Sequence, residues 1–421
     1  MDKLIIEGGV KLKGEVTVSG AKNAVLPILA ATLLTNEPCV IKGAPHLRDT
    51  QSMLKILRAL GKIVEFDKGQ VSVTAGKASN YIAEYKLVST MRASFCVLGP
   101  LLGKLKKAKV SLPGGCVIGV RPVDLHLKGM RALGAQISIN SGYVMAKVKK
   151  LQGAYIYLGG VYGSSVLATD NVMMAAVLAS GKTIIESAAC EPEVVDLAEF
   201  LIKMGAKIKG QGTPMIEIEG VKHLHGAVHS IICDRIEAGT LILAALITGG
   251  DVLIKNVQYQ HLGALIDKLL EAGAHLERVV GALRVKGNQK LRPVNITTLP
   301  YPGFPTDMQA QFMTLMAVTE GISVITEKIY PERFIHISEL ARMGADILLE
   351  GPSAIVKGVK GLSGAPVMAS DLRASAALVL AGLVAKGRTD VQRIYHLDRG
   401  YERIEEKLLK LGANVWREKD K

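Results

Sequence analysis

The sequence predicts an α/β protein of two domains, because one pattern of helix, glycine and strand recurs six times within 421 residues. In each copy, a helical segment ends in Leu-Gly-Ala or a close variant, and an alternating β-branched segment follows. The copies lie 68 to 73 residues apart, and each glycine fits the left-handed position that ends a helix. These glycines are Gly61, Gly134, Gly205, Gly273, Gly344 and Gly412. Six repeats in a chain of this length divide naturally into three per domain.

A second helix, rich in alanine, recurs in the same rhythm and is apolar on almost all sides, so we expect its six copies to be buried. Polar and charged residues gather at the starts of these helices. They are Lys22, Asn23, Arg92, Thr169, Asp170, Asp234, Arg235, Asp307, Asp371 and Arg373. If the three helices of one domain run parallel, their N-termini produce a positive field at one end, which suits anions.

The domains are expected to join near the histidine-rich segment at residues 222–226. We therefore predict one domain at residues 22–229 and a second formed by residues 1–21 together with 230–421. The first strand, at residues 4–8, is expected to pair with the C-terminal domain. A cleft between the two domains is the expected place for a binding site.

The composition favours an anionic partner in a reducing compartment. The net charge is +14, which attracts phosphates and carboxylates. The basic stretches at residues 104–109 and 147–150 carry no interleaved aromatic residues, so we interpret them as solvated faces rather than a nucleic-acid surface. The five cysteines are scattered and include no CxxC pair. Because no signal peptide or membrane-spanning run is recognised, the protein is expected to be soluble and cytoplasmic.

No metal or nicotinamide cofactor site is expected. The segment Gly210-Gln211-Gly212 lacks the third glycine of a dinucleotide fingerprint. His223 and His225 have no further ligand at metal-binding spacing.

Three polar residues are candidates for chemistry, each with a plainer alternative. Cys116 lies in a glycine-rich loop five residues before Arg121, where nearby cations favour a reactive thiolate; the alternative is a small residue in a surface loop. Lys22 opens a buried helix and suits a phosphate, although taken singly it is better interpreted as a solvated lysine. Asp307 also starts a helix, where the N-cap interpretation is favoured over that of a general base.

Six motifs spread over essentially the whole chain resemble those of the bacterial UDP-N-acetylglucosamine enolpyruvyl transferase family. They are SGAKN at 19–23, PGGC at 113–116, RPVDLH at 121–126, FPTDMQ at 304–309, DLRAS at 371–375 and DRGYER at 398–403. The family is also called UDP-N-acetylglucosamine 1-carboxyvinyltransferase, within the EPSP-synthase-like superfamily. The resemblance implies an inside-out α/β barrel, with two domains of three βαβαββ-like repeats each.

The resemblance also implies a reaction. The enolpyruvyl group of phosphoenolpyruvate would pass to the 3-hydroxyl of UDP-N-acetylglucosamine with release of phosphate, without a cofactor. This is the first committed step of peptidoglycan synthesis, and hence part of cell-wall formation, cell shape and division. The resemblance says nothing of an oligomeric partner.

The residue roles below are implied by the resemblance alone. Cys116 is similar to the general acid that protonates the donor, forms a covalent adduct with it and is alkylated by the antibiotic fosfomycin; Asp307 is similar to the base that deprotonates the sugar hydroxyl. The donor anchors would be Lys22, Asn23, Arg92, Arg121 and Arg399. The residues that contact the uridine part of the acceptor would be Arg121, Pro122, Val123, Asp124 and Leu125. Further contacts and supporting residues would be Ser165, Val166, Ile329, Arg333, Asp371 and Arg373.

Two departures limit what is carried over. Residues 163–169 contain no lysine where some relatives have one, so no diphosphate contact is assigned there. Tyr301 stands where some relatives carry histidine, so no acid/base role is assigned to it.

Two alternative functions remain. One is the shikimate-pathway enolpyruvyl transferase, EPSP synthase, which uses the same donor but lacks the PGGC loop. The other is a basic repeat protein that binds nucleic acid without catalysis, which would also account for the positive charge.

Overall fold

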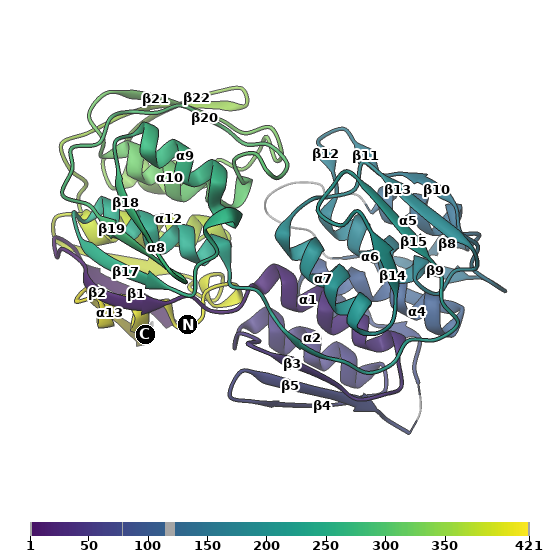
Figure 1. Cartoon of the computed structure of the whole chain (residues 1–421). Coiled ribbons are helices and arrows are strands. Elements are labelled where there is room, and N and C mark those ends of the chain that lie inside the picture. The colour runs from purple at the N-terminus through teal and green to yellow at the C-terminus, as the bar shows by residue number, and fades with distance from the viewer. Residues whose placement is uncertain (1, 78, 114–122, 420–421) are drawn as a thin grey trace. The chain divides into compact units, whose positions relative to one another are not determined.

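The computed structural model describes residues 2–77, 79–113 and 123–419, which form two compact units (Figure 1). The N-terminal unit comprises residues 20–113 and 123–232, and the C-terminal unit comprises residues 2–19 and 233–419. Each unit has a hydrophobic core of its own. In sequence, the N-terminal unit is therefore inserted between two segments of the C-terminal unit.

The N-terminal unit alternates strands and helices throughout. Its elements are α1 (Lys22–Ala31), η1 (Thr32–Leu34), β3 (Cys39–Lys42), α2 (Arg48–Ala59), β4 (Lys62–Asp67), β5 (Gln70–Ala75), β6 (Ile82–Ala83), α3 (Tyr85–Val88), η2 (Arg92–Val97), α4 (Leu98–Leu105), β7 (Lys107–Ser111), α5 (Asp124–Ala132), β8 (Gln136–Asn140), β9 (Tyr143–Lys147), β10 (Tyr155–Tyr157), β11 (Gly159–Gly160), β12 (Gly163–Ser164), α6 (Val166–Ala176), β13 (Lys182–Glu186), α7 (Pro192–Lys203), β14 (Lys207–Lys209), β15 (Met215–Glu219) and β16 (Val228–Ser230).

The C-terminal unit repeats the same alternation. Its elements are β1 (Asp2–Glu7), β2 (Lys13–Thr17), α8 (Arg235–Ile247), β17 (Asp251–Lys255), η3 (Tyr259–Leu262), α9 (Gly263–Glu271), β18 (His275–Val279), β19 (Ala282–Lys286), β20 (Ile296–Thr297), η4 (Thr306–Met308), α10 (Gln309–Ala317), β21 (Ile322–Thr326), α11 (His336–Arg342), β22 (Asp346–Glu350), β23 (Ser353–Lys357), β24 (Pro366–Met368), α12 (Leu372–Val384), β25 (Arg388–Gln392), η5 (Leu397–Arg399), α13 (Ile404–Lys410) and β26 (Asn414–Lys419).

Within the described residues, each unit contains three four-stranded sheets that share one topology. The first two strands of each sheet are parallel, and the remaining neighbours are antiparallel. The sheet orders are β16-β3-β5-β4, β6-β7-β9-β8 and β10-β13-β15-β14 in the N-terminal unit, and β2-β17-β19-β18, β20-β21-β23-β22 and β24-β25-β1-β26 in the C-terminal unit. The sixfold repeat predicted from the sequence is therefore confirmed, and the fold is α/β.

The first strand of the chain completes the last sheet. β1 lies between β25 and β26 and is antiparallel to both, with Leu4 opposite Val391 on one side and Arg417 on the other. The two chain ends accordingly lie together in Figure 1. Leu4, Ile5 and Ile6 are fully buried. The prediction that this strand pairs with the C-terminal domain is confirmed.

The peripheral helix of every repeat ends as the sequence pattern predicts. The helices α2, α5, α7, α9, α11 and α13 are each followed by a glycine with φ between +88° and +97°, and then by a strand. A residue without a Cβ atom adopts this left-handed conformation at little cost. The recurring glycine therefore sets the angle at which each helix returns to its sheet.

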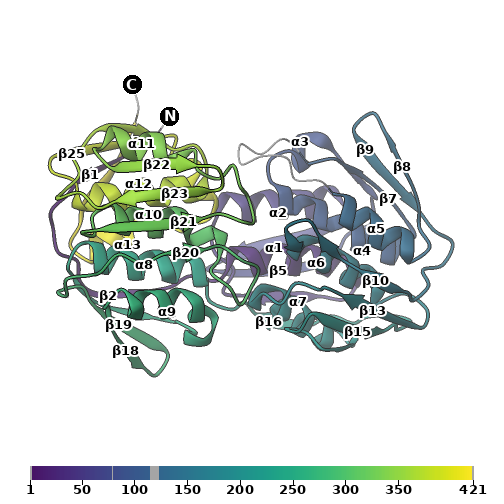
Figure 2. The same ribbon diagram turned by 90° about the horizontal axis from the view of Figure 1, so that it is seen from above.

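The alanine-rich helices form the centre of each unit. α8, α10 and α12 pack against one another in the C-terminal unit, and Figure 2 shows them side by side with sheets outside them. In the N-terminal unit, α1 and α4 both pack on α6. Almost every residue of these helices is buried, as their apolar character predicts.

Close packing of α4 on α6 depends on Gly99. A Cβ atom at Gly99 would lie 2.1 Å from the backbone oxygen of Asn171. We expect Gly99→Ala to lower the free energy of unfolding by about 3 kcal/mol, because the helices must move apart. Gly263→Ala, at the first position of α9, is the control: its Cβ atom would meet no atom within 4 Å, so alanine is expected to be neutral or slightly stabilising. Urea unfolding of both variants measures the difference, and equal midpoints would contradict the packing explanation.

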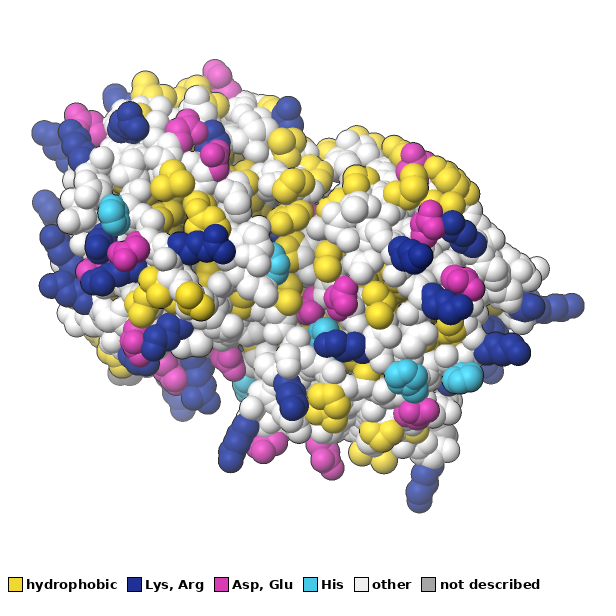
Figure 3. Space-filling view, viewed as in Figure 1, with side chains coloured by type: hydrophobic (Ala, Val, Ile, Leu, Met, Phe, Trp, Pro, Cys, Tyr) yellow, Lys and Arg dark blue, Asp and Glu magenta, His cyan; other side chains and the backbone are white. Residues whose placement is uncertain are grey.

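The charged surface is mixed in sign. On the face in Figure 3, lysine and arginine side chains are interspersed with acidic and uncharged ones. Among the helices that the structure describes, none is long and apolar enough to cross a membrane.

Candidate active site

Asp307 lies where chain segments from three parts of the C-terminal unit meet. It belongs to η4, directly before α10, and each of its carboxylate oxygens accepts a hydrogen bond from an arginine. Arg333 Nη1 is 2.8 Å from Oδ1, and Arg373 Nη2 is 2.8 Å from Oδ2. Arg333 lies between β21 and α11, whereas Arg373 lies in the first turn of α12. The structure thus brings together three residues that the sequence resemblance selected.

The interpretation of Asp307 as a helix N-cap is wrong. The cap positions of η4 and α10 are Pro305 and Met308, and neither helix has a side-chain cap hydrogen bond. The carboxylate instead accepts two charge-assisted hydrogen bonds, which are stronger than a bond to a neutral backbone N–H group.

The two arginines control the charge of Asp307. Burial acts to raise the pKa of the carboxyl group, but the charges of Arg373 and Arg333 and their hydrogen bonds outweigh burial and hold the pKa well below its usual range. Both guanidinium groups are almost fully buried, whereas the Asp307 side chain is 27% exposed. Asp307 is therefore an ionised carboxylate at neutral pH, and part of its side chain is accessible to solvent.

A buried phenol links the starts of the three central helices. The Tyr401 hydroxyl lies 2.9 Å from Thr240 Oγ1 on α8, 3.2 Å from Gln311 Nε2 on α10 and 3.3 Å from Arg373 Nη1 on α12. Burial raises the pKa of Tyr401, so the hydroxyl keeps its proton. The sequence named Tyr401 only as part of a motif, and nothing in its spacing from Thr240 or Gln311 indicated this network.

Asp371 is the N-cap of α12. Its carboxylate accepts hydrogen bonds from the backbone N–H groups of Arg373 and Ala374, at 2.8 and 3.2 Å. Its charge also favours the protonated forms of Arg333 and His336, although burial dominates for His336 and lowers its pKa to about 4. Asp371 therefore holds the helix that carries Arg373.

The remaining predicted residues of this unit lie on turns. Ile329 is half-buried in the turn after β21, and its backbone N–H donates to Glu327. Arg399 is the half-buried last residue of η5. The preceding residue, Asp398, forms an ion pair with Arg417 of β26 that fixes this turn.

In the N-terminal unit, the interpretation of Lys22 as a solvated lysine is wrong. Lys22 is the first residue of α1 and is only 9% exposed, and its Nζ lies 2.8 Å from Asp49 Oδ2 at the start of α2. Asn23, the next residue, is half-buried. An ammonium group carries positive charge and three donors, so it is a suitable contact for an anion.

Two further groups of predicted residues lie at the starts of α5 and α6. Val123 precedes α5, and Asp124 and Leu125 are its first two residues. Ser165 caps α6 by accepting a hydrogen bond from a backbone N–H, and Val166 is the first residue of that helix.

A buried polar pair connects α6 with the first turn of α5. Asn171 Nδ2 of α6 lies 3.0 Å from His126 Nδ1 of α5. Burial, with a contribution from the charge of Arg92, lowers the pKa of His126 to about 3, so the neutral ring accepts this hydrogen bond. Arg92 is half-buried at the start of η2. Arg92 thus acts electrostatically on the start of α5.

Three predicted residues, Cys116, Arg121 and Pro122, lie outside the described residues. The other four cysteines are free thiols, and all but Cys190 are buried. Burial raises the pKa of the thiols of Cys39, Cys96 and Cys190, which disfavours the nucleophilic thiolate.

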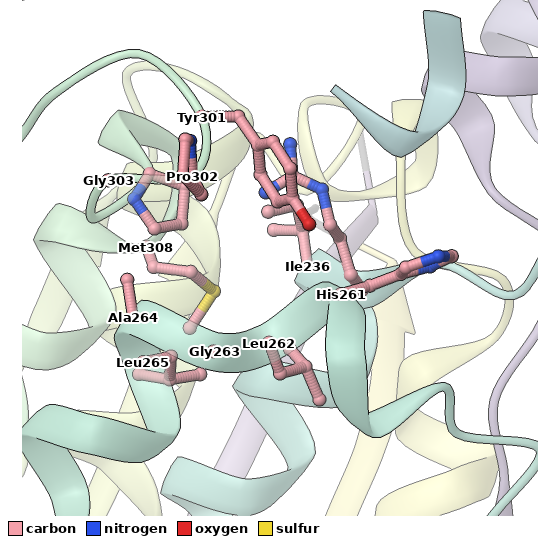
Figure 4. A pocket seen from close by; sticks show the side chains of 12 residues that line it. Ile236, His261, Leu262, Gly263, Ala264, Leu265, Tyr301, Pro302, Gly303 and Met308 are labelled. Atoms are coloured by element: carbon pink, nitrogen blue, oxygen red, sulfur yellow. The ribbon is translucent and has the colours of Figure 1, made fainter. Parts of the chain in front are cut away.

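A pocket adjoins the turn that carries Asp307. In Figure 4, Tyr301 and Pro302 stand on one side, the residues from Leu262 to Leu265 form another, and Met308 points its sulfur toward the space. The Tyr301 ring stacks with Arg235, whose guanidinium carbon lies 5.5 Å from the ring centre. Tyr301 thus serves as a wall of this pocket.

The chain has the fold of the enolpyruvyl transferases. The sequence profile of the EPSP synthase (3-phosphoshikimate 1-carboxyvinyltransferase) family matches residues 6–408. The crystal structure of the enolpyruvyl transferase NikO from Streptomyces tendae superposes with a TM-score of 0.90 at 25% identity, covering 100% of this chain and 99% of that chain. EPSP synthase from Acinetobacter baumannii has a TM-score of 0.76 at 20% identity over the whole of both chains, and shares the fold alone.

Sequence relatives are more specific. The UDP-N-acetylglucosamine 1-carboxyvinyltransferase of Myxococcus xanthus is 56% identical over 422 residues and 100% of both chains. Those of Methylacidiphilum infernorum and Geotalea uraniireducens are 56% identical over 417 residues and 99% of each chain. The chain therefore belongs to the UDP-N-acetylglucosamine 1-carboxyvinyltransferase family, as its motifs predicted.

Proposed function

We propose that this protein transfers the enolpyruvyl group of phosphoenolpyruvate to the 3-hydroxyl of UDP-N-acetylglucosamine and releases phosphate. The observation that carries this proposal is 56% identity, over its full length, to relatives of that name. The reaction belongs to peptidoglycan synthesis, and both substrates are phosphorylated metabolites of the cytoplasm, where we expect it to occur. We also propose that the three sheets around three helices in each unit form the inside-out α/β barrel of this family.

Asp307 is proposed as the general base. It would accept the proton of the 3-hydroxyl as the sugar oxygen forms its bond to the donor. A carboxylate held by two arginines is a weak base. When an anionic substrate shares the hydrogen bonds of Arg333 or Arg373, the hold of these residues on Asp307 weakens and its basicity rises. Substrate binding would thus raise the pKa of Asp307 and make it a stronger base.

Cys116 is proposed as the general acid and the site of the covalent adduct. Its proton would pass to the methylene carbon of the donor, leaving positive charge on the carbon that carries the phosphate. The sugar oxygen, or the sulfur, can then bond to that carbon. Loss of a proton from the new methyl group together with phosphate restores the double bond, so atoms and charge balance.

The substrates carry a phosphate, a carboxylate and a diphosphate, and arginine binds such groups through two parallel hydrogen bonds. We propose that the donor is bound by Lys22, Asn23, Arg92, Arg121 and Arg399. We propose that the acceptor is bound by Arg121, Pro122, Val123, Asp124, Leu125, Ser165, Val166 and Ile329. Arg333, Asp371 and Arg373 would support Asp307.

The test is phosphate release from phosphoenolpyruvate in the presence of each candidate acceptor. Release with UDP-N-acetylglucosamine and none with shikimate-3-phosphate is expected, and the opposite pattern would assign the chain to the shikimate reaction. Filter binding at low and physiological salt addresses the nucleic-acid alternative. Tight, salt-dependent binding without phosphate release would overturn the proposal.

A further inference from the structure

Glu327 departs from the repeat pattern of the fold. It follows β21, and in four other repeats the residue after the equivalent strand has a positive φ. Those residues are Gly43, Ser187, Asn256 and Arg393. Glu327 does not have this conformation and is instead a fully buried carboxylate, with 0% exposure. A fully buried acidic side chain needs hydrogen-bond partners, and these partners indicate what Glu327 does in the fold.

The carboxylate of Glu327 accepts four hydrogen bonds from neutral donors. Oε1 accepts from the Thr298 hydroxyl at 2.6 Å and from the backbone N–H groups of Ile329 and Tyr330 at 2.8 and 2.9 Å. Oε2 accepts from the Thr306 hydroxyl at 2.8 Å. One side chain thus fixes both the turn that leads to Arg333 and the start of η4.

The bond to Thr306 leads directly to Asp307. A hydroxyl has one proton, and the Thr306 proton is donated to Glu327, so the Thr306 oxygen is left to accept. It accepts from Arg333 Nη1 at 3.0 Å, and the same nitrogen donates to Asp307 Oδ1 at 2.8 Å. The position of Arg333 against Asp307 therefore depends on which way Thr306 points its proton.

We propose that Glu327 is a positioning residue for the reaction: by accepting the Thr306 proton and two backbone N–H groups, it holds Arg333 against Asp307. This inference rests on the base role proposed above for Asp307. Because Glu327 is fully buried, we assign it no contact with the substrates.

The test is Glu327→Gln, which keeps the shape of the side chain. Two backbone N–H groups fix an oxygen at the Oε1 position, so the amide nitrogen must face Thr306. The Thr306 proton would then lose its acceptor, while the Thr306 oxygen would face the amide as well as Arg333. An oxygen that no longer donates its own proton is a weaker acceptor, so its hydrogen bond from Arg333 would weaken. We expect kcat to fall by about 10-fold or more, because a misplaced group outside the reacting atoms costs this much, with both KM values within about 3-fold.

The pH profile separates positioning from general stability. Weaker contact with Arg333 raises the pKa of Asp307, so the acid limb of the kcat profile moves to higher pH in Glu327→Gln. Thr306→Val, which removes the same relay, is expected to move the limb in the same direction. Thr298→Val is the matched control: it removes a donor to the other oxygen of Glu327, costs about 1 kcal/mol of stability and leaves the limb in place.

Equal losses of kcat in Glu327→Gln and Thr298→Val without movement of the acid limb would overturn the inference. A crystal structure of Glu327→Gln gives a readout that does not depend on the reaction. The hydrogen bond from Arg333 to Thr306 should be longer in it than the 3.0 Å of the unmodified protein, and an unchanged length would overturn the inference. If the unmodified protein released no phosphate, the reaction assignment would fail, and this structure would still decide the role of Glu327 in holding Arg333.

Discussion

Turnover is expected to fall by about 10²- to 10⁴-fold when Asp307 is replaced by asparagine, because the amide cannot accept the proton of the sugar hydroxyl. The amide has nearly the shape of the carboxylate and keeps one acceptor for the two arginines that contact it. Phosphate release under saturating substrates measures the effect. Turnover within about 3-fold of the parent would exclude the base role.

The same change is expected to lower the free energy of unfolding by about 3 kcal/mol, because Arg333 and Arg373 stay buried without their counter-charge. The pKa of Asp307 is depressed in the folded state, so its stabilising effect is complete above the ordinary aspartate pKa of about 4 and is lost as the pH falls through the depressed value. The stabilities of parent and variant should therefore converge only in strongly acidic buffer.

Asp251→Asn is the matched control. Asp251 also binds an arginine through both oxygens, but Arg284 and Asp251 are 46% and 41% exposed. An ion pair exposed to solvent contributes little to stability, and the variant is expected to keep full turnover. A loss of turnover in Asp251→Asn equal to that in Asp307→Asn would show that the assay reports stability rather than chemistry.

Cys116→Ser is expected to lower turnover by about 10²-fold or more and to abolish inactivation by fosfomycin, because a serine hydroxyl is a far weaker acid and nucleophile than a thiol. In the unmodified protein, mass spectrometry should find fosfomycin on this one cysteine. The buried thiols Cys39 and Cys96 are poor competitors because their pKa values are raised.

The control for this prediction is Cys190→Ser. Cys190 is half-buried, which makes it the most accessible of the four described thiols. The variant is expected to retain both turnover and inactivation. If Cys116→Ser kept both properties, the proposed role of that thiol would be wrong.

The sequence predicted the repeat because its signals are local. Each of the six glycines ends a helix through its own backbone conformation, and each alanine-rich helix is apolar on all sides whatever surrounds it. Because every repeat folds in the same way, every sheet begins with a parallel pair of strands. For the same reason β1 pairs with β25 and β26 to complete the last sheet.

The contacts within the candidate site were not predictable in this way because they join distant residues. Asp307 was interpreted as a helix cap since its arginine partners lie 26 and 66 residues away. Lys22 was interpreted as solvated since its partner, Asp49, begins another helix. Glu327 lies in no recognised motif, and only its buried hydrogen bonds mark it.

The place of β1 in the last sheet imposes an order on synthesis. Residues 2–7 leave the ribosome long before the strands on both sides of them, β25 and β26. The inserted unit, by contrast, has all its residues once position 232 has emerged. A nascent chain stalled before β25 would thus contain every residue of the N-terminal unit. Its apolar residues Leu4 to Ile6, which are buried in the complete protein, would still lack the strands that pair with them.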